Sequence, residues 1–101
     1  MSSFVRVAAI SDLQPGQCKV VVAEGQQIAL FNVGGTFYAL DNTCLHRGGP
    51  LGEGFLEGKI VTCPWHGWTY DVTNGVCVVN PNITIKTYQV KVEGSDVQVG
   101  V

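Results

Sequence analysis

The sequence predicts an all-β fold, a small antiparallel sandwich or barrel, and three observations support this. Short runs that alternate polar and apolar residues recur along the chain. Glycine-containing turn sequences separate these runs, and the 101 residues include 13 glycines. No window shows the helical period over three turns. A chain of this length forms one domain, so a single domain over residues 1–101 is expected.

Each predicted strand ends at a recognisable turn or loop. Residues 4–8 form the first apolar run, and Glu24-Gly25 and Gly34-Gly35 are two-residue connections suited to tight hairpins. Asn74-Gly75 is a further turn signal, and Glu93-Gly94-Ser95 closes a C-terminal hairpin. The predicted strands are residues 4–8, 19–23, 26–33, 36–41, 86–92 and 96–101.

The composition excludes several classes of partner. Apolar residues make up 46% of the chain and charged residues 14%, and the formal net charge is −2. The six basic residues are scattered, whereas nucleic acids and anionic membranes attract clustered Lys and Arg. The N-terminal residues do not resemble a secretory signal, and no run is long enough to span a bilayer. We therefore expect a cytoplasmic monomer, in which four cysteines are metal ligands or free thiols.

Residues 42–68 carry the chemistry, in two loops rich in glycine and proline. The first loop holds Cys44 and His46, and the second holds Cys63 and His66. Two thiolates and two imidazoles can bind a structural zinc ion or a [2Fe–2S] cluster. Zinc fingers place their cysteines together and their histidines together, whereas each loop here supplies one of each. This alternation favours a binuclear cluster.

The segments CLHRGG and CPWHGWTYD closely resemble the two cluster-binding motifs of Rieske iron–sulfur proteins. The resemblance implies a Rieske-type antiparallel β-sandwich with a small cluster-binding subdomain of two loops, about residues 42–68. It also implies one [2Fe–2S] cluster per chain. Cys44 and Cys63 would bind the inner iron, and His46 and His66 the outer iron.

Residues near the ligands indicate a low-potential subclass. High-potential Rieske proteins have an additional cysteine in each motif, but Gly49 and Trp65 stand at those positions. Trp68 replaces a serine that donates a hydrogen bond to a bridging sulfide. Tyr70 matches the tyrosine of the family, whose hydroxyl is suited to donate to a cysteine sulfur. Fewer donors to the sulfur atoms stabilise the reduced cluster less.

The other cysteines and the residues beside the ligands have more ordinary interpretations. Cys18 and Cys77 lie outside both motifs and are predicted to be free buried thiols. Trp68 is expected in the core. The residues expected near a docking partner are Leu45, Arg47, Pro64 and Trp65.

The predicted function is electron transfer rather than catalysis. Both histidines are assigned to the cluster, so no 2-His-1-carboxylate iron site can form, and no G-x-G-x-x-G motif follows a strand. The resemblance implies a ferredoxin that passes electrons from a flavin-dependent reductase to an oxygenase, such as a ring-hydroxylating dioxygenase. One alternative is the small Rieske-like subunit of an assimilatory nitrite reductase. Another is a structural or redox-sensing module that contains zinc.

The redox potential tests the subclass. We expect a midpoint potential at the low end of the Rieske range, about −150 mV rather than about +300 mV, because the sulfur atoms have few hydrogen-bond donors. A spectroscopic redox titration measures it, and a value well above zero would contradict the assignment.

Overall fold

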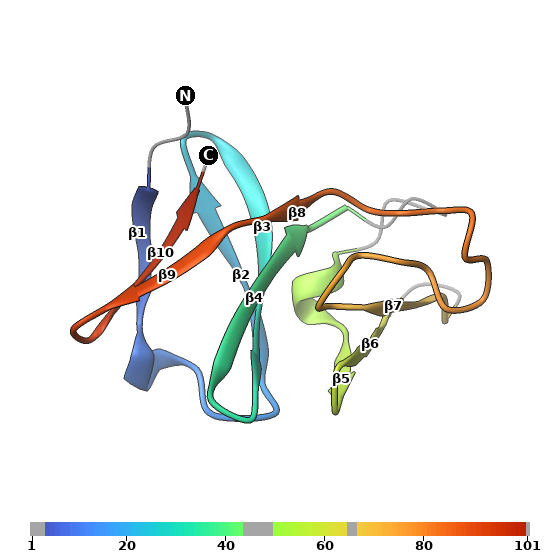
Figure 1. Ribbon diagram of the computed structural model, residues 1–101, viewed down its shortest axis with the longest axis horizontal. Coiled ribbons are helices and arrows are strands. Elements are labelled where there is room, and N and C mark those ends of the chain that lie inside the picture. The colour runs from blue at the N-terminus through green and yellow to red at the C-terminus, as the bar shows by residue number, and fades with distance from the viewer. Residues whose placement is uncertain (1–3, 44–49, 65–66, 101) are drawn as a thin grey trace.

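The computed structural model describes residues 4–43, 50–64 and 67–100, and its strands form three antiparallel sheets (Figure 1). The strand orders are β1-β10-β9, β2-β3-β4-β8 and β5-β6-β7. The elements are β1 (Phe4–Ala9), η1 (Ile10–Asp12), β2 (Cys18–Ala23), β3 (Gln26–Val33), β4 (Thr36–Asp41), η2 (Leu51–Glu53), β5 (Phe55–Glu57), β6 (Ile60–Thr62), β7 (Thr69–Asp71), β8 (Thr87–Tyr88), β9 (Val90–Glu93) and β10 (Asp96–Gly100). The all-β antiparallel prediction is confirmed.

Two tight turns connect β2, β3 and β4 as predicted. Ala23 pairs with Gln26 across Glu24-Gly25, and both turn residues have positive φ, at 50° and 79°. Gly34 and Gly35 close the next hairpin with φ of 57° and 99°. Positive φ at both central positions suits the right-handed twist of the flanking strands. These turns therefore fix the register of the central sheet.

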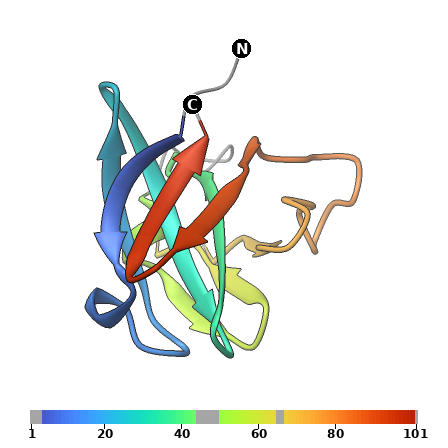
Figure 2. The ribbon, with the colours of Figure 1, turned by 60° about the vertical axis from the view of Figure 1, so that its left-hand side comes forward.

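Strand β3 is buried on both faces, because it lies between two apolar cores. Ile28 and Leu30 face a core that includes residues of the β1-β10-β9 sheet, which lies in front of the central strands in Figure 2. Ala29 and Phe31 face the second core, which includes residues of β6 and β7. All four side chains have no exposed surface. The central sheet is thus a shared layer between the β1-β10-β9 sheet and the β5-β6-β7 sheet.

The predicted strand over residues 86–92 is divided at Gln89. Its first part, β8, pairs with β4, whereas its second part, β9, pairs with β10 in a different sheet. The main-chain carbonyl of Gln89 accepts a hydrogen bond from the amide of Gly100 at 2.9 Å. One polypeptide run therefore passes from one sheet to the other, as at the corners of β-sandwiches.

The loops expected over residues 42–68 contain regular structure as well. The short helix η2 and the strands β5 and β6 all begin and end within this range. Strands of three residues are too short to show alternation in the sequence, which is why they escaped prediction. Within the described ranges, no helix is long and apolar enough to cross a membrane.

Gly75 provides a test of this packing. Its φ is +78°, and an added Cβ would overlap the main-chain oxygen of Ile85, whose amide donates a hydrogen bond to Gly75. Gly94 has a similar φ of +62° but open space around it. Both glycines have positive φ, so the backbone strain of the two alanine variants is comparable. We therefore expect Gly75→Ala to lower the free energy of unfolding by at least about 1 kcal/mol more than Gly94→Ala. Urea denaturation measures both, and equal losses would contradict the close approach.

Candidate metal centre

The first cysteine–histidine segment is closed at its base by backbone contacts. Thr43 and Pro50, which flank it, form an antiparallel bridge. The amide of Leu51 donates to the carbonyl of Asn42 at 2.7 Å. Residues 44–49 lie outside the described residues, so the predicted ligands Cys44 and His46 are not placed. The structure does place the chain on both sides of them.

The second segment is closed in the same way. Thr62 of β6 pairs with Thr69 of β7, and beyond this pair the amide of Cys63 donates to the carbonyl of Trp68 at 2.7 Å. Cys63 is 1% exposed, whereas Pro64 and Gly67 are exposed. His66 and Trp65 lie outside the described part of the chain. The segment therefore leaves the core for the surface within one residue of Cys63.

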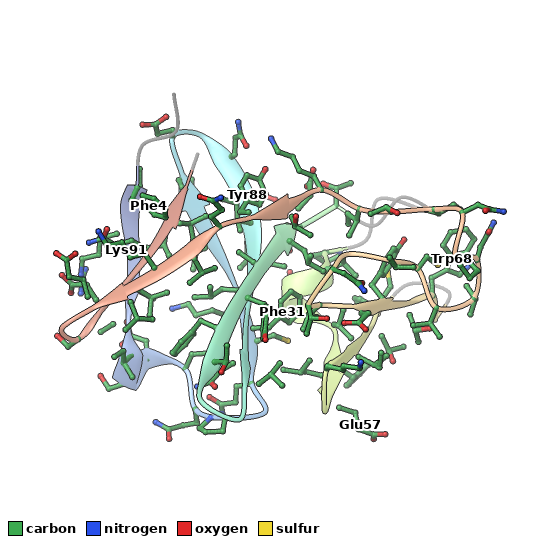
Figure 3. The ribbon with its side chains drawn as sticks, viewed as in Figure 1. Phe4, Phe31, Glu57, Trp68, Tyr88 and Lys91 are labelled. Carbon is green, nitrogen blue, oxygen red and sulfur yellow. The ribbon has the colours of Figure 1, made fainter. Side chains whose placement is uncertain are left out.

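Apolar side chains surround Cys63. It belongs to the second core together with Tyr70 and Cys77, which have no exposed surface. Trp68 is half-buried against this core, in agreement with its predicted place (Figure 3). Figure 3 shows Trp68 at the end of the molecule remote from Phe4 and Lys91. The hydrogen bond predicted from Tyr70 to a cysteine sulfur stays a prediction.

Cys18 and Cys77 are free thiols, as predicted, but only Cys77 is fully buried. Cys18 is half-buried, and its thiol donates to the carbonyl of Gly54 at 3.5 Å. Partial burial raises the pKa of the Cys18 thiol, because removal from water disfavours the thiolate. Neither thiol lies in a cysteine–histidine motif, so neither is a candidate cluster ligand.

An ion pair joins β7 to the turn between β5 and β6. The carboxylate of Asp71 lies 3.4 Å from the Lys59 ammonium and accepts hydrogen bonds from the amide and hydroxyl of Thr73. Desolvation alone would raise the pKa of Asp71. The hydrogen bonds and the lysine outweigh it and hold this pKa below its usual value. The ion pair therefore stabilises the end of the β5-β6-β7 sheet that is remote from Cys63.

The described residues fit an iron–sulfur cluster. A thiol with almost no exposed surface, in an apolar core, is suited to ligate soft iron away from water. The residue that follows Cys63, Pro64, is already exposed. Sequence reasoning found this cysteine through its motif, but it missed Asn42 and the exposed pair Val78 and Val79, which no motif includes.

Comparison with known proteins identifies the family of the chain. Residues 3–89 match the Rieske [2Fe-2S] domain. The chain belongs to the Rieske family. Members of this family bind one [2Fe–2S] cluster per chain, and this Rieske chain does so too.

Several relatives cover nearly the whole Rieske chain. The ferredoxin component of the naphthalene 1,2-dioxygenase system of Pseudomonas putida is 37% identical, over 95% of this chain and 93% of its own. The ferredoxin component of the biphenyl 2,3-dioxygenase of Rhodococcus jostii is 34% identical, over 96% and 92%. The ferredoxin of carbazole 1,9a-dioxygenase from Nocardioides aromaticivorans superposes with a TM-score of 0.89 at 27% identity, over 96% of each chain.

A nitrite reductase small subunit from Mycobacterium tuberculosis also superposes well. Its TM-score is 0.91, and the match covers 100% of this chain and 96% of that one. The sequence identity is 23%, so this likeness shows a common fold alone.

Two buried cysteines of the same core offer a matched test of ligation. Cys63→Ala and Cys77→Ala remove the same atoms from fully buried positions. We expect Cys63→Ala to lose the visible absorbance and both irons of the cluster, because the predicted thiolate ligand is removed. Cys77→Ala is expected to retain two irons per chain. Iron analysis of the purified variants measures this, and a Cys63→Ala protein with two irons would contradict the assignment.

Proposed function

We propose that this Rieske chain accepts single electrons from a flavin-dependent reductase and passes them to the terminal oxygenase of a ring-hydroxylating dioxygenase system. The proposed cluster ligands are Cys44, His46, Cys63 and His66. The observation that carries the proposal is similarity over nearly the full length to ferredoxin components of dioxygenase systems. The role is that of an electron carrier and not of a catalyst.

A solved complex supports the choice of acceptor. The carbazole 1,9a-dioxygenase complex of reduced oxygenase and oxidised ferredoxin contains a chain 35% identical to this one. That chain superposes with a TM-score of 0.87, over 95% of this chain and 91% of its own. An oxygenase is therefore the partner best supported for this ferredoxin, whereas the reductase follows from the proposed role.

The cluster, when bound, supplies a site that gains and loses one electron. Where Cys63 binds this cluster, the cluster would border the apolar core that surrounds Cys63. The core around Cys63 excludes water, and the exposed Pro64 and Gly67 leave the adjoining surface open to a partner. Electron transfer needs close approach rather than a substrate pocket, and this arrangement provides it.

We propose that the docking surface consists of the residues predicted from the sequence together with Val78 and Val79. Of Leu45, Arg47, Pro64 and Trp65, the structure describes Pro64, which is exposed. The amide of Val78 donates to the carbonyl of Thr69 at 2.8 Å, directly after the second ligand segment.

The stretch of chain that contains Val78 and Val79 carries little charge. Val78 is 50% exposed and Val79 60%. In residues 60–85, Asp71 is the only acidic residue, and the range contains no lysine or arginine. An apolar patch with few charges suits a weak and transient interface.

The free thiols support a reducing compartment. Neither Cys18 nor Cys77 forms a disulfide in the described part of the chain. Small domains in oxidising compartments usually use their cysteines in disulfides. The cytoplasm is therefore the proposed location. The nitrite reductase alternative has support from the fold alone, and no observation favours it over the ferredoxin.

Electron paramagnetic resonance tests the cluster type. Reduction with dithionite is expected to give a rhombic signal with an average g value below that of the free electron, because two histidines ligate one iron. A colourless protein with one zinc ion per chain would contradict the electron-carrier function.

A matched pair of exposed valines tests the docking surface. Val79 and Val22 are both 60% exposed, but Val22 lies on β2. We expect Val79→Glu to slow reduction of the oxygenase by at least about tenfold, because a charge would be buried without a partner. Val22→Glu is expected to leave the rate unchanged. Stopped-flow kinetics with the oxygenase measures both, and equal rates would contradict the proposed surface.

A further inference from the structure

Asn42 is hydrogen-bonded to the chain that follows the first cysteine–histidine segment, residues 44–49, and directly precedes Thr43 at the start of that segment. It follows β4 directly, and its residue is 3% exposed. Its side-chain oxygen Oδ1 accepts a hydrogen bond from the amide of Gly52 at 2.8 Å, and its main-chain carbonyl accepts from Leu51 at 2.7 Å. Its Nδ2 donates to Oε1 of Gln27 at 3.4 Å. One buried residue therefore holds the chain on both sides of residues 44–49 and ties it to β3.

Gly52, the partner of this carboxamide, is seated on β2. A Cβ added at Gly52 would lie 2.7 Å from Cγ2 of Val20 and 2.8 Å from the carbonyl carbon and oxygen of Lys19. Such distances are closer than real Cβ contacts allow, so only glycine fits this approach without movement of the backbone. The hydrogen bond from Gly52 to Asn42 is therefore made from a fixed position.

Gly54 makes a similarly close contact with the chain that leads to the second cysteine–histidine segment. An added Cβ at Gly54 would overlap the carbonyl oxygen of Thr62, the residue before Cys63. The chain from Asn42 through Gly52 and Gly54 to Cys63 is thus a continuous series of close contacts. A shift at Asn42 would change the separation of the two ligand-bearing segments.

We infer that the Asn42 carboxamide is a positioning residue for the cluster, because it joins the two described ends of the first cysteine–histidine segment, and the chain that follows this segment contacts Thr62, the residue before Cys63. The inference rests on the proposed ligand set. A buried side-chain amide that made only structural hydrogen bonds would affect folding and leave the cluster unchanged. A positioning residue would change how firmly the cluster is held, as residues that orient metal ligands do.

Asn32 is a matched control for Asn42. It is also 3% exposed, its Nδ2 donates to the carbonyl of Leu13 at 2.7 Å, and its Oδ1 accepts from the amide of Gly35 at 2.8 Å. It lies near the end of β3 opposite to Gln27, the neighbour of Asn42. Replacing either residue by alanine removes two side-chain hydrogen bonds from a buried site.

The experiment compares iron release from the holoprotein to a chelator, divided by the global unfolding rate from circular dichroism. Asn42→Ala is expected to raise this ratio at least about tenfold over wild type and to shift the g values of the reduced cluster. Asn32→Ala is expected to leave both unchanged. Asn42→Asp, which keeps the oxygen that accepts from Gly52, is expected to retain the wild-type ratio. Equal ratios for the two alanine variants, or no rescue by Asn42→Asp, would overturn the inference.

A second pair of variants covers failure of Asn42→Ala to fold. Gly52→Ala is expected to raise the ratio because it displaces the donor, whereas Gly100→Ala, with no atom nearer than 3.5 Å to the added Cβ, is not. An unchanged ratio in Gly52→Ala would overturn the inference. If Cys44→Ala keeps both irons, the ligand set itself fails and the inference fails with it. Equal ratios with the ligand set intact would overturn the inference alone.

Discussion

The burial of β3 on both faces is the constraint on which the remaining structure depends. The run Ile28–Phe31 has no exposed surface, so each face must be covered by apolar side chains. The β1-β10-β9 sheet covers one face, and the chain from Leu51 to Ile85 supplies residues that cover the other. Cys63 belongs to this second core, so the β5-β6-β7 sheet and Cys63 cannot leave the central sheet without exposing Phe31.

The sequence was most informative where a local pattern fixed the structure. Glu24-Gly25 and Gly34-Gly35 adopt the positive φ values that tight hairpins need, so β2, β3 and β4 could be placed from the sequence. The division at Gln89 of the predicted strand over residues 86–92 could not be predicted. It depends on the neighbour with which each half pairs, β4 for β8 and β10 for β9, whereas the alternation of polar and apolar residues continues through Gln89.

Some residues of the candidate site were likewise predicted from the sequence, and others were not. Cys63 was predicted as a ligand from its motif, since thiol and imidazole groups at fixed spacing have few other uses, and the structure places it in an apolar core. Its role as a ligand stays a prediction. Asn42 was not identified, because its function depends on Gly52, ten residues away, and on the approach of Gly52 to β2. Val78 and Val79 were missed for a related reason. A short apolar run is usually buried, and the exposure of Val78 and Val79, directly after the buried Cys77, is known only from the structure.

The closed bases of the two ligand segments bear on the speed of electron exchange. When the charge of a redox centre changes, the surrounding atoms must rearrange, and the energy of that rearrangement slows the transfer. Here the hydrogen bonds from Leu51 to Asn42 and from Cys63 to Trp68 restrain the chain where each segment begins and ends. The apolar core beside Cys63 contains few dipoles that could reorient. Both features limit the rearrangement of the described residues near Cys63, and a small rearrangement suits a carrier that must give up its electron during a brief encounter.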